Sequence, residues 1–344
     1  MSDWQNHIHH GDCLRFIQEK IDELANSFRV IYIDPPFLSG TDYSLKNRSG
    51  GNATSAGTVQ ETPTYSDKWQ DLEEYLDFMK PRLEGMRKLL TDNGSLWVHL
   101  DWHVSHYVKT LLDGIFNYQN FINEIVWKRT NSPKIQSKGL GAQHDVILLY
   151  AKEARNFQLN TIYREHDEKS LKPYSYKDEQ GRFRLIEIEA QGIQRTENRK
   201  QFEWRGRRAP YLYRKEILDK WWEEGKIYRS KHGRYTKKQY LHDTTGVPVS
   251  DLWFDIPPVQ GGSLEYTGFL TQKPEALLER IIQASSDHGD LVGDFFAGSG
   301  TTAIAAHKLG RRWLLCEEVA STLEIFKNRL QNLDRSAKYS FSSF

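Results

Sequence analysis

The chain has 344 residues, of which 38% are hydrophobic and 27% charged, with a formal net charge of +1. This length exceeds that of a typical single domain, so we expect one large α/β domain with an insertion. No run of about 18 apolar residues occurs, and the first residues lack a basic and apolar signal, so no membrane span or secretion signal is expected. Two cysteines, Cys13 and Cys316, are too few for a disulfide framework or a zinc site, which favours a reducing cytoplasm and no metal.

The positive charge is concentrated in one part of the chain. Residues 199–240 contain 14 Lys and Arg against 5 Asp and Glu. The tryptophans and tyrosines interleaved with them are Trp204, Tyr211, Tyr213, Trp221, Trp222, Tyr228, Tyr235 and Tyr240. This combination is typical of a surface that follows nucleic-acid phosphates and stacks bases. A solvated, well-packed helical face is the alternative, and composition alone favours neither.

Strand and helix patterns alternate before this basic stretch. Residues 29–33 form a β-branched run that ends at Asp34 and predicts a buried parallel strand. Residues 38–68 are rich in Gly, Ser, Thr and Asn and predict a long mobile loop. The further expected elements are a helix over 71–90, a turn at 92–94, a strand over 95–100, a helix over 102–116 and a strand over 144–150.

The pattern changes after residue 150 and returns toward the C-terminus. Residues 155–264 are polar, aromatic and basic, and we interpret them as a region inserted into one domain made of 1–154 and 265–344. The elements expected after the insertion are a helix over 271–285, a strand over 291–296, a helix over 301–309 and a strand over 312–316. Strand–helix alternation on both sides predicts an α/β fold with a Rossmann-like, mostly parallel, doubly wound sheet.

A Gly-rich turn follows the strand over 291–296. It reads Asp294-Phe295-Phe296-Ala297-Gly298-Ser299-Gly300-Thr301-Thr302. A strand, a Gly-rich turn and a helix N-terminus together can hold a nucleotide-like ligand. Gly298 and Gly300 let the backbone approach that ligand, and Thr301 and Thr302 are expected to cap the helix. A triphosphate-binding P-loop is disfavoured, because no lysine follows Gly300.

Two acidic residues complete the expected ligand site. Glu317 ends the next strand, where its carboxylate is placed to bind ribose hydroxyls. The short strand over 8–10 and its tip, Gly11-Asp12-Cys13, are expected beside it, so that Asp12 and the backbone of Cys13 reach an adenine ring. The two ends of the chain would then form one sheet, as in a circularly permuted fold. The alternatives are a surface role for Glu317 and a plain turn at Gly11-Asp12.

Asp34-Pro35-Pro36-Phe37 closes the strand over 29–33, and these four are the candidate catalytic residues. The Asp34 carboxylate and the Pro35 carbonyl can accept both N–H bonds of a base amine, which favours the tetrahedral nitrogen that develops during methyl transfer. The prolines stiffen the turn, and Phe37 offers a ring for stacking the base. A base in a duplex must first be flipped out to reach such a site. The alternative is a plain turn after a strand.

Together these motifs resemble the DNA amino-methyltransferases of the β group, in which the catalytic motif precedes the cofactor motif, and the modification subunits of type III restriction systems. Residues 34–37 are similar to that family's Asp-Pro-Pro-[Tyr/Phe], and residues 294–302 to its cofactor loop. Thr271-Gln272-Lys273-Pro274 resembles the element before that loop, where the Lys-Pro helix start helps to hold the methionine part of S-adenosyl-L-methionine. The cofactor-binding residues that the resemblance implies are Asp12, Cys13, Lys273, Asp294, Phe296, Gly298, Ser299, Gly300, Thr301, Thr302 and Glu317.

The resemblance implies a site-specific methyltransferase that acts on the N6 amine of adenine in double-stranded DNA, with residues 155–264 as its target-recognition region. The DNA-binding residues expected there are Arg205, Arg207, Arg208, Lys231 and Arg234. It also implies a cytoplasmic, nucleoid-associated protein, with a homodimer and a cognate restriction endonuclease as candidate partners. An N4-cytosine methyltransferase, which more often carries Ser-Pro-Pro-Tyr, an RNA or protein amine methyltransferase, and an inert DNA-binding protein on the same core remain the alternatives.

Overall fold

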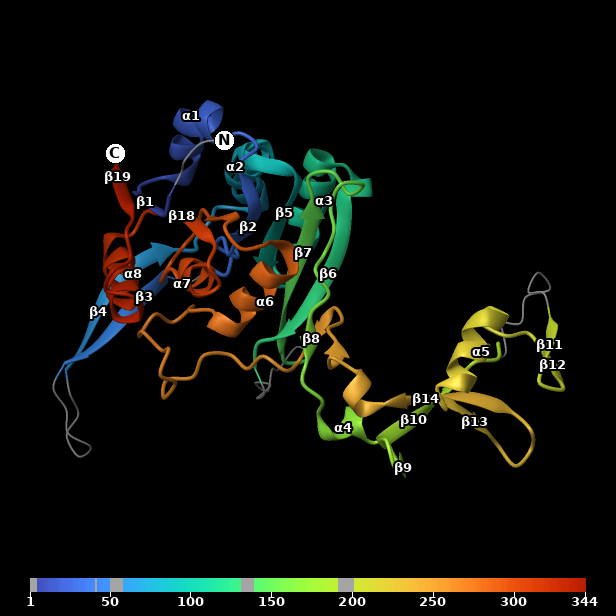
Figure 1. The fold of residues 1–344 in the computed structure, drawn as a ribbon. Helices are drawn as coiled ribbons and strands as arrows, with labels where there is room; N and C mark the ends of the chain where they lie inside the picture. The colour runs from blue at the N-terminus through green and yellow to red at the C-terminus, as the bar shows by residue number, and fades with distance from the viewer. Residues whose placement is uncertain (1–4, 41, 50–57, 131–138, 191–200) are drawn as a thin grey trace. The chain divides into compact units, whose positions relative to one another are not determined.

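The protein divides into two compact units. The computed structural model describes residues 5–40, 42–49, 58–130, 139–190 and 201–344, with the backbone alone at 42–49 and 58–66. Unit 1 comprises Met1–Ile162 and Ser250–Phe344, and unit 2 comprises Tyr163–Val249. Unit 1 is therefore formed from both ends of the chain (Figure 1), and unit 2 lies within the segment that the sequence pattern sets apart.

Unit 1 is built on one nine-stranded sheet. In spatial order its strands are β16 (Leu252–Trp253), β6 (Phe121–Lys128), β7 (His144–Ala151), β5 (Leu90–Leu100), β2 (Phe28–Ile33), β17 (Leu291–Asp294), β18 (Arg312–Glu317), β1 (His7–His10) and β19 (Ser340–Ser343). Among these nine strands, β7 runs antiparallel to its neighbours β5 and β6, and the other pairs are parallel. This arrangement confirms the mostly parallel, Rossmann-like sheet predicted from the sequence.

The strand order explains how the two ends of the chain meet. β2, which ends just before Asp34, pairs with β17, and Asp294 lies opposite Tyr32. β1 pairs with β18, which puts His10 opposite Glu317, and β19 then pairs with β1 at the edge of the sheet (Figure 1). Because the carboxyl ends of parallel strands meet at one edge, Asp34, Asp294 and Glu317 all belong to that edge.

Helices cover both faces of this sheet. One group of helices consists of α1 (Cys13–Leu24), α2 (Leu72–Leu89) and α3 (Ser105–Phe116). The other group, on the opposite face (Figure 1), consists of α6 (Glu275–Ser285), α7 (Thr301–Lys308) and α8 (Ala320–Leu333). In α2, the buried residues Met79, Leu83 and Met86 recur at helical spacing and form an apolar stripe. The carboxylate of Asp71 caps that helix by accepting the N–H of Glu74 at 2.9 Å.

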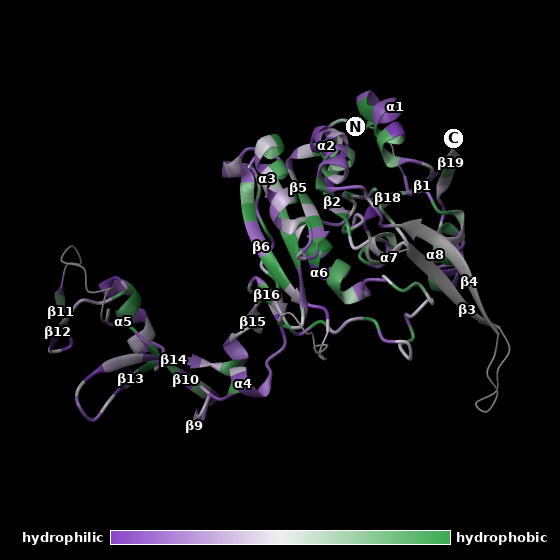
Figure 2. Ribbon diagram, turned by 180° about the vertical axis from the view of Figure 1, so that it is seen from behind, coloured by the Kyte–Doolittle hydropathy of each residue, from purple (hydrophilic) through white to green (hydrophobic). Residues whose placement is uncertain are grey.

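The central strands are buried on both faces, as a parallel sheet between two helical layers requires. In β2, Phe28, Val30, Ile31 and Ile33 are fully buried. Figure 2 shows hydrophobic residues gathered on strands such as β5 and β6, whereas α1 is largely hydrophilic. The buried residues of these strands and of α1, α2 and α3 form one hydrophobic cluster, which fixes the carboxyl edge of the strands.

Parts of unit 1 differ from the sequence predictions. The sequence predicts a loop over 38–68, but β3 (Asp42–Ser49) and β4 (Thr58–Ser66) pair as an antiparallel hairpin, with residues 41 and 50–57 outside the described residues. Three Thr, one Val and one Tyr in β4 favour a strand, and the Gly and Ser content of the segment obscures them. The sequence prediction also lacked β6 and α8, and α3 begins three residues later than expected.

Unit 2 consists of small sheets and short helices. Its elements are β8 (Tyr163–Arg164), α4 (Glu168–Leu171), β9 (Tyr176–Asp178), β10 (Gly181–Glu187), β11 (Phe202–Trp204), β12 (Arg207–Ala209), α5 (Lys215–Glu223), β13 (Ile227–Arg229), β14 (Tyr235–Tyr240) and β15 (Val247–Pro248). β10 lies between β9 and β14 in its largest sheet. In the described parts of both units, no helix is long and apolar enough to cross a membrane.

Candidate active site

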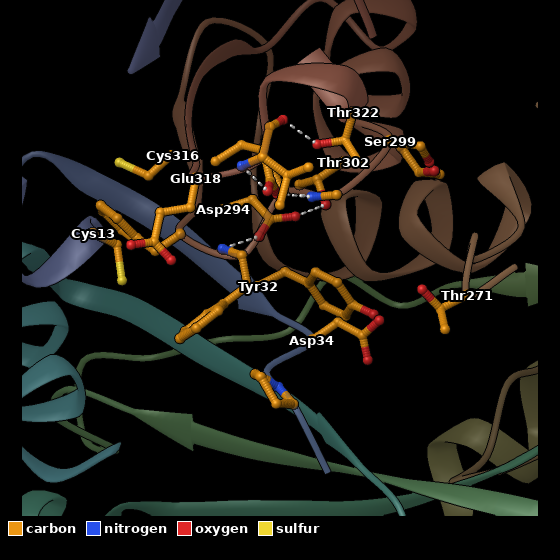
Figure 3. Close-up of a pocket in the computed structure, with 18 of the residues that line it drawn as sticks. Cys13, Tyr32, Asp34, Thr271, Asp294, Ser299, Thr302, Cys316, Glu318 and Thr322 are labelled. Atoms are coloured by element: carbon orange, nitrogen blue, oxygen red, sulfur yellow. Dashed lines mark hydrogen bonds between the residues drawn. The ribbon is translucent and has the colours of Figure 1, made fainter. Parts of the chain in front are cut away.

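The motifs from both ends of the chain line one cavity of about 390 Å³ in unit 1 (Figure 3). The predicted site residues that line it are Asp12, Cys13, Asp34, Pro36, Lys273, Asp294, Phe296, Gly298, Ser299, Thr301, Thr302 and Glu317. Pro35, Phe37 and Gly300 are not among its lining residues. A cavity of this size at the carboxyl ends of parallel strands is where doubly wound proteins bind their ligands.

Two glycines give the turn after β17 its shape. Gly298 and Gly300 have φ angles of 50° and 74°, which glycine adopts without steric penalty. A Cβ atom on Gly300 would lie 2.2 Å from Cδ2 of Phe326, and one on Gly298 would lie 3.1 Å from Cε1 of Phe269. Gly300 is therefore needed for close packing as well as for its backbone angle, and it precedes the first residue of α7.

Asp294 holds the turn in place. Its Oδ1 accepts the N–H of Phe296 at 3.0 Å, and its Oδ2 accepts the hydroxyl of Thr302. The prediction that Thr301 and Thr302 cap α7 was wrong: within the described chain no side chain caps this helix, and the hydroxyl of Thr301 accepts a hydrogen bond from Arg329 at 3.0 Å. Burial raises the pKa of Asp294 to about 7.

Glu317 faces the same turn from the end of β18. Its Oε2 accepts the N–H of Gly298 at 2.6 Å, and its Oε1 accepts the N–H of Val319 at 2.8 Å. A carboxylate can accept about four hydrogen bonds, so the oriented Glu317 can still accept one from a ligand beside its contact with Thr322. Burial raises the pKa of Glu317 to about 7.

Asp12 lies at another wall of the cavity. Its Oδ1 caps α1 by accepting the N–H of Arg15 at 2.8 Å, and its Oδ2 is bound by the guanidinium of Arg82. Arg82 is buried, and its guanidinium lies 3.5 Å from the ring centroid of Phe78. Both Phe78 and Arg82 line the cavity. The position of Asp12 is therefore set by a helix cap and by an ion pair with a buried arginine.

The two oxygens of Asp34 have different environments. Oδ2 is ion-paired with the ammonium of Lys273, which also lies 5.6 Å from the ring centroid of Phe37. Oδ1 is buried and has no hydrogen-bond partner among the described residues. Because an unsatisfied buried acceptor costs about 1–3 kcal/mol, Oδ1 is a candidate acceptor for a donor on a bound ligand. The resemblance assigns Lys273 to the methionine end of the cofactor, whereas here its ammonium contacts Asp34.

The backbone after residue 36 is held by a second carboxylate. Asp67 accepts the N–H of Leu38 and the N–H of Ser39, each at 2.8 Å. Leu38 has a φ angle of 60°, an uncommon value for leucine that these hydrogen bonds stabilise. The ring of Phe37 stacks on His99, with centroids 6.2 Å apart and an angle of 26° between the planes. Residues 34–37, here named the catalytic turn after their predicted role, are thus fixed from both sides.

A family model described as DNA methylase matches residues 28–328, which include both the catalytic turn and the Gly-rich turn. The chain belongs to this DNA methylase family. It is 32% identical over 294 residues to the type II methyltransferase M.EcaI of Enterobacter cloacae, covering 84% of this chain and 62% of that protein. It is 29% identical over 343 residues to the Mod subunit of the type III restriction-modification enzyme StyLTI of Salmonella typhimurium, covering 89% of this chain and 51% of that protein.

The match confirms the family that the motifs resemble, and a solved structure supports the fold. The match to TTHA0409 of Thermus thermophilus covers 98% of this chain and 100% of that chain, at 17% identity and a TM-score of 0.50. That protein has also been crystallised with S-adenosyl-L-methionine. The chain spans 62% and 51% of the lengths of the two curated relatives, so each relative has a part that has no counterpart in this chain.

The five side chains predicted to bind DNA lie in unit 2, in two kinds of environment. Arg207 donates two hydrogen bonds, of 2.7 and 2.9 Å, to the buried carboxylate of Glu189. Arg234 donates to Glu187 at 2.5 Å. The charges of both arginines are therefore largely compensated within the unit.

The other three basic side chains are exposed. The guanidinium of Arg205 lies 4.0 Å from a ring centroid of Trp222, and its φ angle is 49°. Arg208 and Lys231 form no ion pair within the described part of the chain. These three carry the uncompensated positive charge among the residues singled out from the sequence.

The aromatic residues of the basic stretch mostly belong to the core of unit 2. Trp204, Tyr211, Tyr235 and Tyr240 are buried, and the first three pack in one hydrophobic cluster. Among the eight, the structure leaves Trp222 and Tyr228 exposed beyond a third of their surface. The base-stacking interpretation therefore fails for the four buried rings, and their packing explains them.

Several lining residues were absent from the sequence prediction: Tyr32, Trp69, Phe78, Arg82 and Phe269. Tyr32 was identifiable, because it precedes Asp34 by two residues and side chains alternate along a strand. Arg82 was also identifiable, as a charged residue on the apolar stripe of α2. The three aromatic residues come from separate segments, and nothing local connects them with the cavity.

Proposed function

We propose that this methylase is a site-specific DNA methyltransferase that transfers a methyl group from S-adenosyl-L-methionine to the N6 amine of adenine. One observation carries the proposal. The unpartnered Oδ1 of Asp34 belongs to the same cavity as the Gly-rich turn and Glu317. A proposed acceptor for a base amine and a proposed binding site for a nucleoside-type methyl donor thus lie in one cavity.

The residues of the cavity suit the cofactor. Gly298 lets the backbone turn approach a ligand closely, and Glu317 keeps lone pairs for ribose hydroxyls. The carboxylate of Asp12 and the backbone of Cys13 are the proposed contacts of the adenine ring. When bound, S-adenosyl-L-methionine supplies a methyl group on a sulfonium centre, which the amine nitrogen attacks.

The chemistry proposed for Asp34 follows from the weak nucleophilicity of a base amine, whose lone pair is conjugated with the ring. A hydrogen bond from that amine to Oδ1 of Asp34 favours the tetrahedral nitrogen, and the carboxylate stabilises the positive charge that develops there. The carbonyl of Pro35 is the proposed acceptor of the second N–H bond. The ion pair with Lys273 restricts rotation of the Asp34 carboxylate, and Oδ1 takes up the proton that the methylated nitrogen releases.

Unit 2 is the proposed target-recognition region. Its exposed basic side chains supply phosphate contacts, which position a protein on DNA without reading its sequence. Trp222 and Tyr228 are the exposed rings available for contacts with bases or sugars. The target base must leave the duplex to reach Asp34, at a cost of a few kcal/mol.

Replacement of Asp34 tests the function. Asp34→Ala is expected to abolish methyl transfer to duplex DNA and to leave S-adenosyl-L-methionine binding, measured by calorimetry, nearly unchanged. Asp34→Asn is the matched control for shape, because its amide keeps one acceptor but loses the charge. Full methyl transfer by the Ala variant would refute the role of Asp34, and failure of the unmodified protein to bind the cofactor would refute the function.

The choice of base rests on the Asp-Pro-Pro-Phe sequence of the turn and is tested separately. Nucleoside mass spectrometry of DNA treated with the protein is expected to detect N6-methyladenine. If N4-methylcytosine is detected instead, the substrate is cytosine and not adenine, and the proposed methyl-transfer mechanism is unaffected.

We also propose a homodimer and a cognate restriction endonuclease as partners, because a relative is the Mod subunit of a restriction-modification enzyme. Size-exclusion chromatography with light scattering tests the first. Co-purification from the native host tests the second. A monomer at all concentrations would exclude the homodimer, and recovery from the host without a second chain would exclude the endonuclease.

A further inference from the structure

Three buried polar side chains connect the cavity with the interior of the sheet. The hydroxyl of Tyr32 lies 2.9 Å from Nδ1 of His99, and Nε2 of His99 lies 3.1 Å from Oδ2 of Asp145. The exposed fractions of the three residues are 2%, 0% and 2%. They come from β2, β5 and β7, which are neighbours in the sheet, and Tyr32 also lines the cavity (Figure 3).

The direction of hydrogen bonding along this chain follows from Asp145. Burial opposes its ionisation, but the hydrogen bond from His99 and the nearby charge of Arg129 lower the pKa of Asp145. As a carboxylate it accepts the Nε2–H of His99, and in the neutral imidazole Nδ1 is then an acceptor. Burial raises the pKa of Tyr32 well above its usual range, so its hydroxyl stays protonated and donates to Nδ1. Each of the three groups thus has a hydrogen bond to another of the three, while Oδ1 of Asp145 has no hydrogen bond among the described residues and lies 3.3 Å from Nη1 of Arg129.

This chain meets the catalytic turn at two points. Tyr32 precedes Asp34 by two residues, so both side chains leave the strand on the same face, and the charge of Asp34 acts on the hydroxyl of Tyr32. The ring of Phe37 stacks on the imidazole of His99, and Trp127 contacts that imidazole edge-on at 5.5 Å. The orientation of the imidazole therefore helps to set the position of the turn.

We propose that Tyr32, His99 and Asp145 are positioning residues that hold the catalytic turn in the geometry needed for methyl transfer. The inference rests on the proposed function of that turn. The hydrogen bonds of this buried chain favour one arrangement, because breaking them leaves further polar groups unpaired in a region of low dielectric constant. Displacement of a reacting group by about 1 Å can lower a rate by about 10²-fold. The three residues thus affect catalysis without touching the base.

Tyr32→Phe is the least disruptive test, because it removes a single oxygen atom. The expected result is a fall in kcat of about 10-fold to 100-fold, with the KM for DNA and the Kd for S-adenosyl-L-methionine nearly unchanged. Tyr150→Phe is the matched control. It removes another hydroxyl of the same sheet, which donates to Asp113 at 2.6 Å and does not line the cavity. It is expected to lower the Tm by a similar amount and to leave kcat unchanged.

A double-mutant cycle tests whether the three residues act as one chain. Asp145→Asn keeps the shape of the side chain and removes its charge, and it is expected to lower kcat as Tyr32→Phe does. The variant that carries both changes should be little slower than the slower single variant, because each change breaks the same chain. Two independent effects would multiply instead, and that result would contradict a single chain.

The outcomes separate this inference from the proposed function. If the unmodified protein transfers no methyl group to DNA, the proposed function fails, and the positioning role that rests on it fails with it. If the unmodified protein is active and Tyr32→Phe has the same kcat, the positioning role is overturned. A loss of cofactor affinity that accounts for the whole loss of activity in Tyr32→Phe would also overturn it.

Discussion

Unit 1 and unit 2 use their charged side chains in opposite ways. In unit 1, Asp294, Arg82 and Asp145 are buried, and each has a hydrogen-bond partner or ion-pair partner that fixes its position. In unit 2, Arg208 and Lys231 are exposed, without an ion pair in the described chain. Buried charges require partners because of their desolvation penalty, whereas exposed charges act through their summed field. Substitutions in unit 1 should therefore disturb one step strongly, and substitutions on the surface of unit 2 should have graded, salt-dependent effects.

The largest effect is expected at Gly300. Gly300→Ala combines the strain of a positive φ angle with a clash against Phe326, and should lower the free energy of unfolding by about 2–5 kcal/mol and abolish cofactor binding. Gly206 in unit 2 is the matched control, because its φ angle is 76° and nothing lies within 4 Å of an added Cβ. Gly206→Ala should lose only about 1–2 kcal/mol. Denaturant unfolding measures both, and equal losses would show that packing at the turn contributes nothing.

Arg207 is expected to be structural although it was predicted to bind DNA. Arg207→Ala leaves the buried carboxylate of Glu189 without its two hydrogen bonds, and should lower the stability of unit 2 by about 1–3 kcal/mol. Arg208→Ala, one residue away, should leave stability unchanged. Thermal unfolding of the two variants checks this. If Arg207→Ala is stable but binds DNA more weakly, Arg207 is a DNA-binding residue and not a structural one.

Cofactor binding should depend on pH through Glu317. Its pKa of about 7 means that the carboxyl takes up a proton as the pH falls through neutrality and becomes a poorer acceptor for ribose hydroxyls. Affinity for S-adenosyl-L-methionine should therefore rise between about pH 6 and about pH 8. In Glu317→Gln the rise in affinity should be smaller, and what remains should come from Asp294, whose pKa is also about 7. In the control variant Glu318→Gln the full rise should remain. Calorimetry at the two pH values measures the ratio of affinities, and the same ratio in Glu317→Gln would exclude this role.

The smallest effect is expected from the exposed charges of unit 2. Arg208→Ala combined with Lys231→Ala should weaken DNA binding and reduce the slope of log K against log salt by about 1.8, which is about 0.9 for each phosphate that the variant no longer neutralises. The methyl-transfer rate at saturating DNA should not change. Fluorescence anisotropy over a series of salt concentrations measures the slope, and an unaltered slope would move the DNA surface away from these side chains.

The residues of the two turns were predictable because each turn is formed by consecutive residues whose types indicate its conformation. Gly298 and Gly300 signalled positive φ angles, and Asp34 before two prolines signalled a rigid acidic turn. His99 gave no such signal, since its partners Tyr32 and Asp145 are 67 and 46 residues away along the chain. Within the predicted strand His99 was only a polar residue in an apolar run.

The predictions that rested on residue composition alone were wrong in part, because composition does not show how side chains pack. The Gly- and Ser-rich segment after the catalytic turn predicted a loop, but backbone pairing forms the β3–β4 hairpin. The basic and aromatic stretch predicted one DNA surface, but Trp204 and Tyr235 form core and Arg207 forms an ion pair. Composition indicates the kinds of side chain present, whereas cross-strand neighbours decide which of them reach the surface.

The α/β alternation, the two turns and the acidic residues at the strand ends follow from the sequence, because they depend on periodicity and on backbone angles that neighbouring residues impose. Folding was needed to pair Lys273 with Asp34, to place Arg82 against Asp12, and to bury a chain of polar groups behind the catalytic turn. These contacts join segments far apart in the sequence. They form only when the two ends of the chain enter one sheet, where burial makes an unpaired polar group costly.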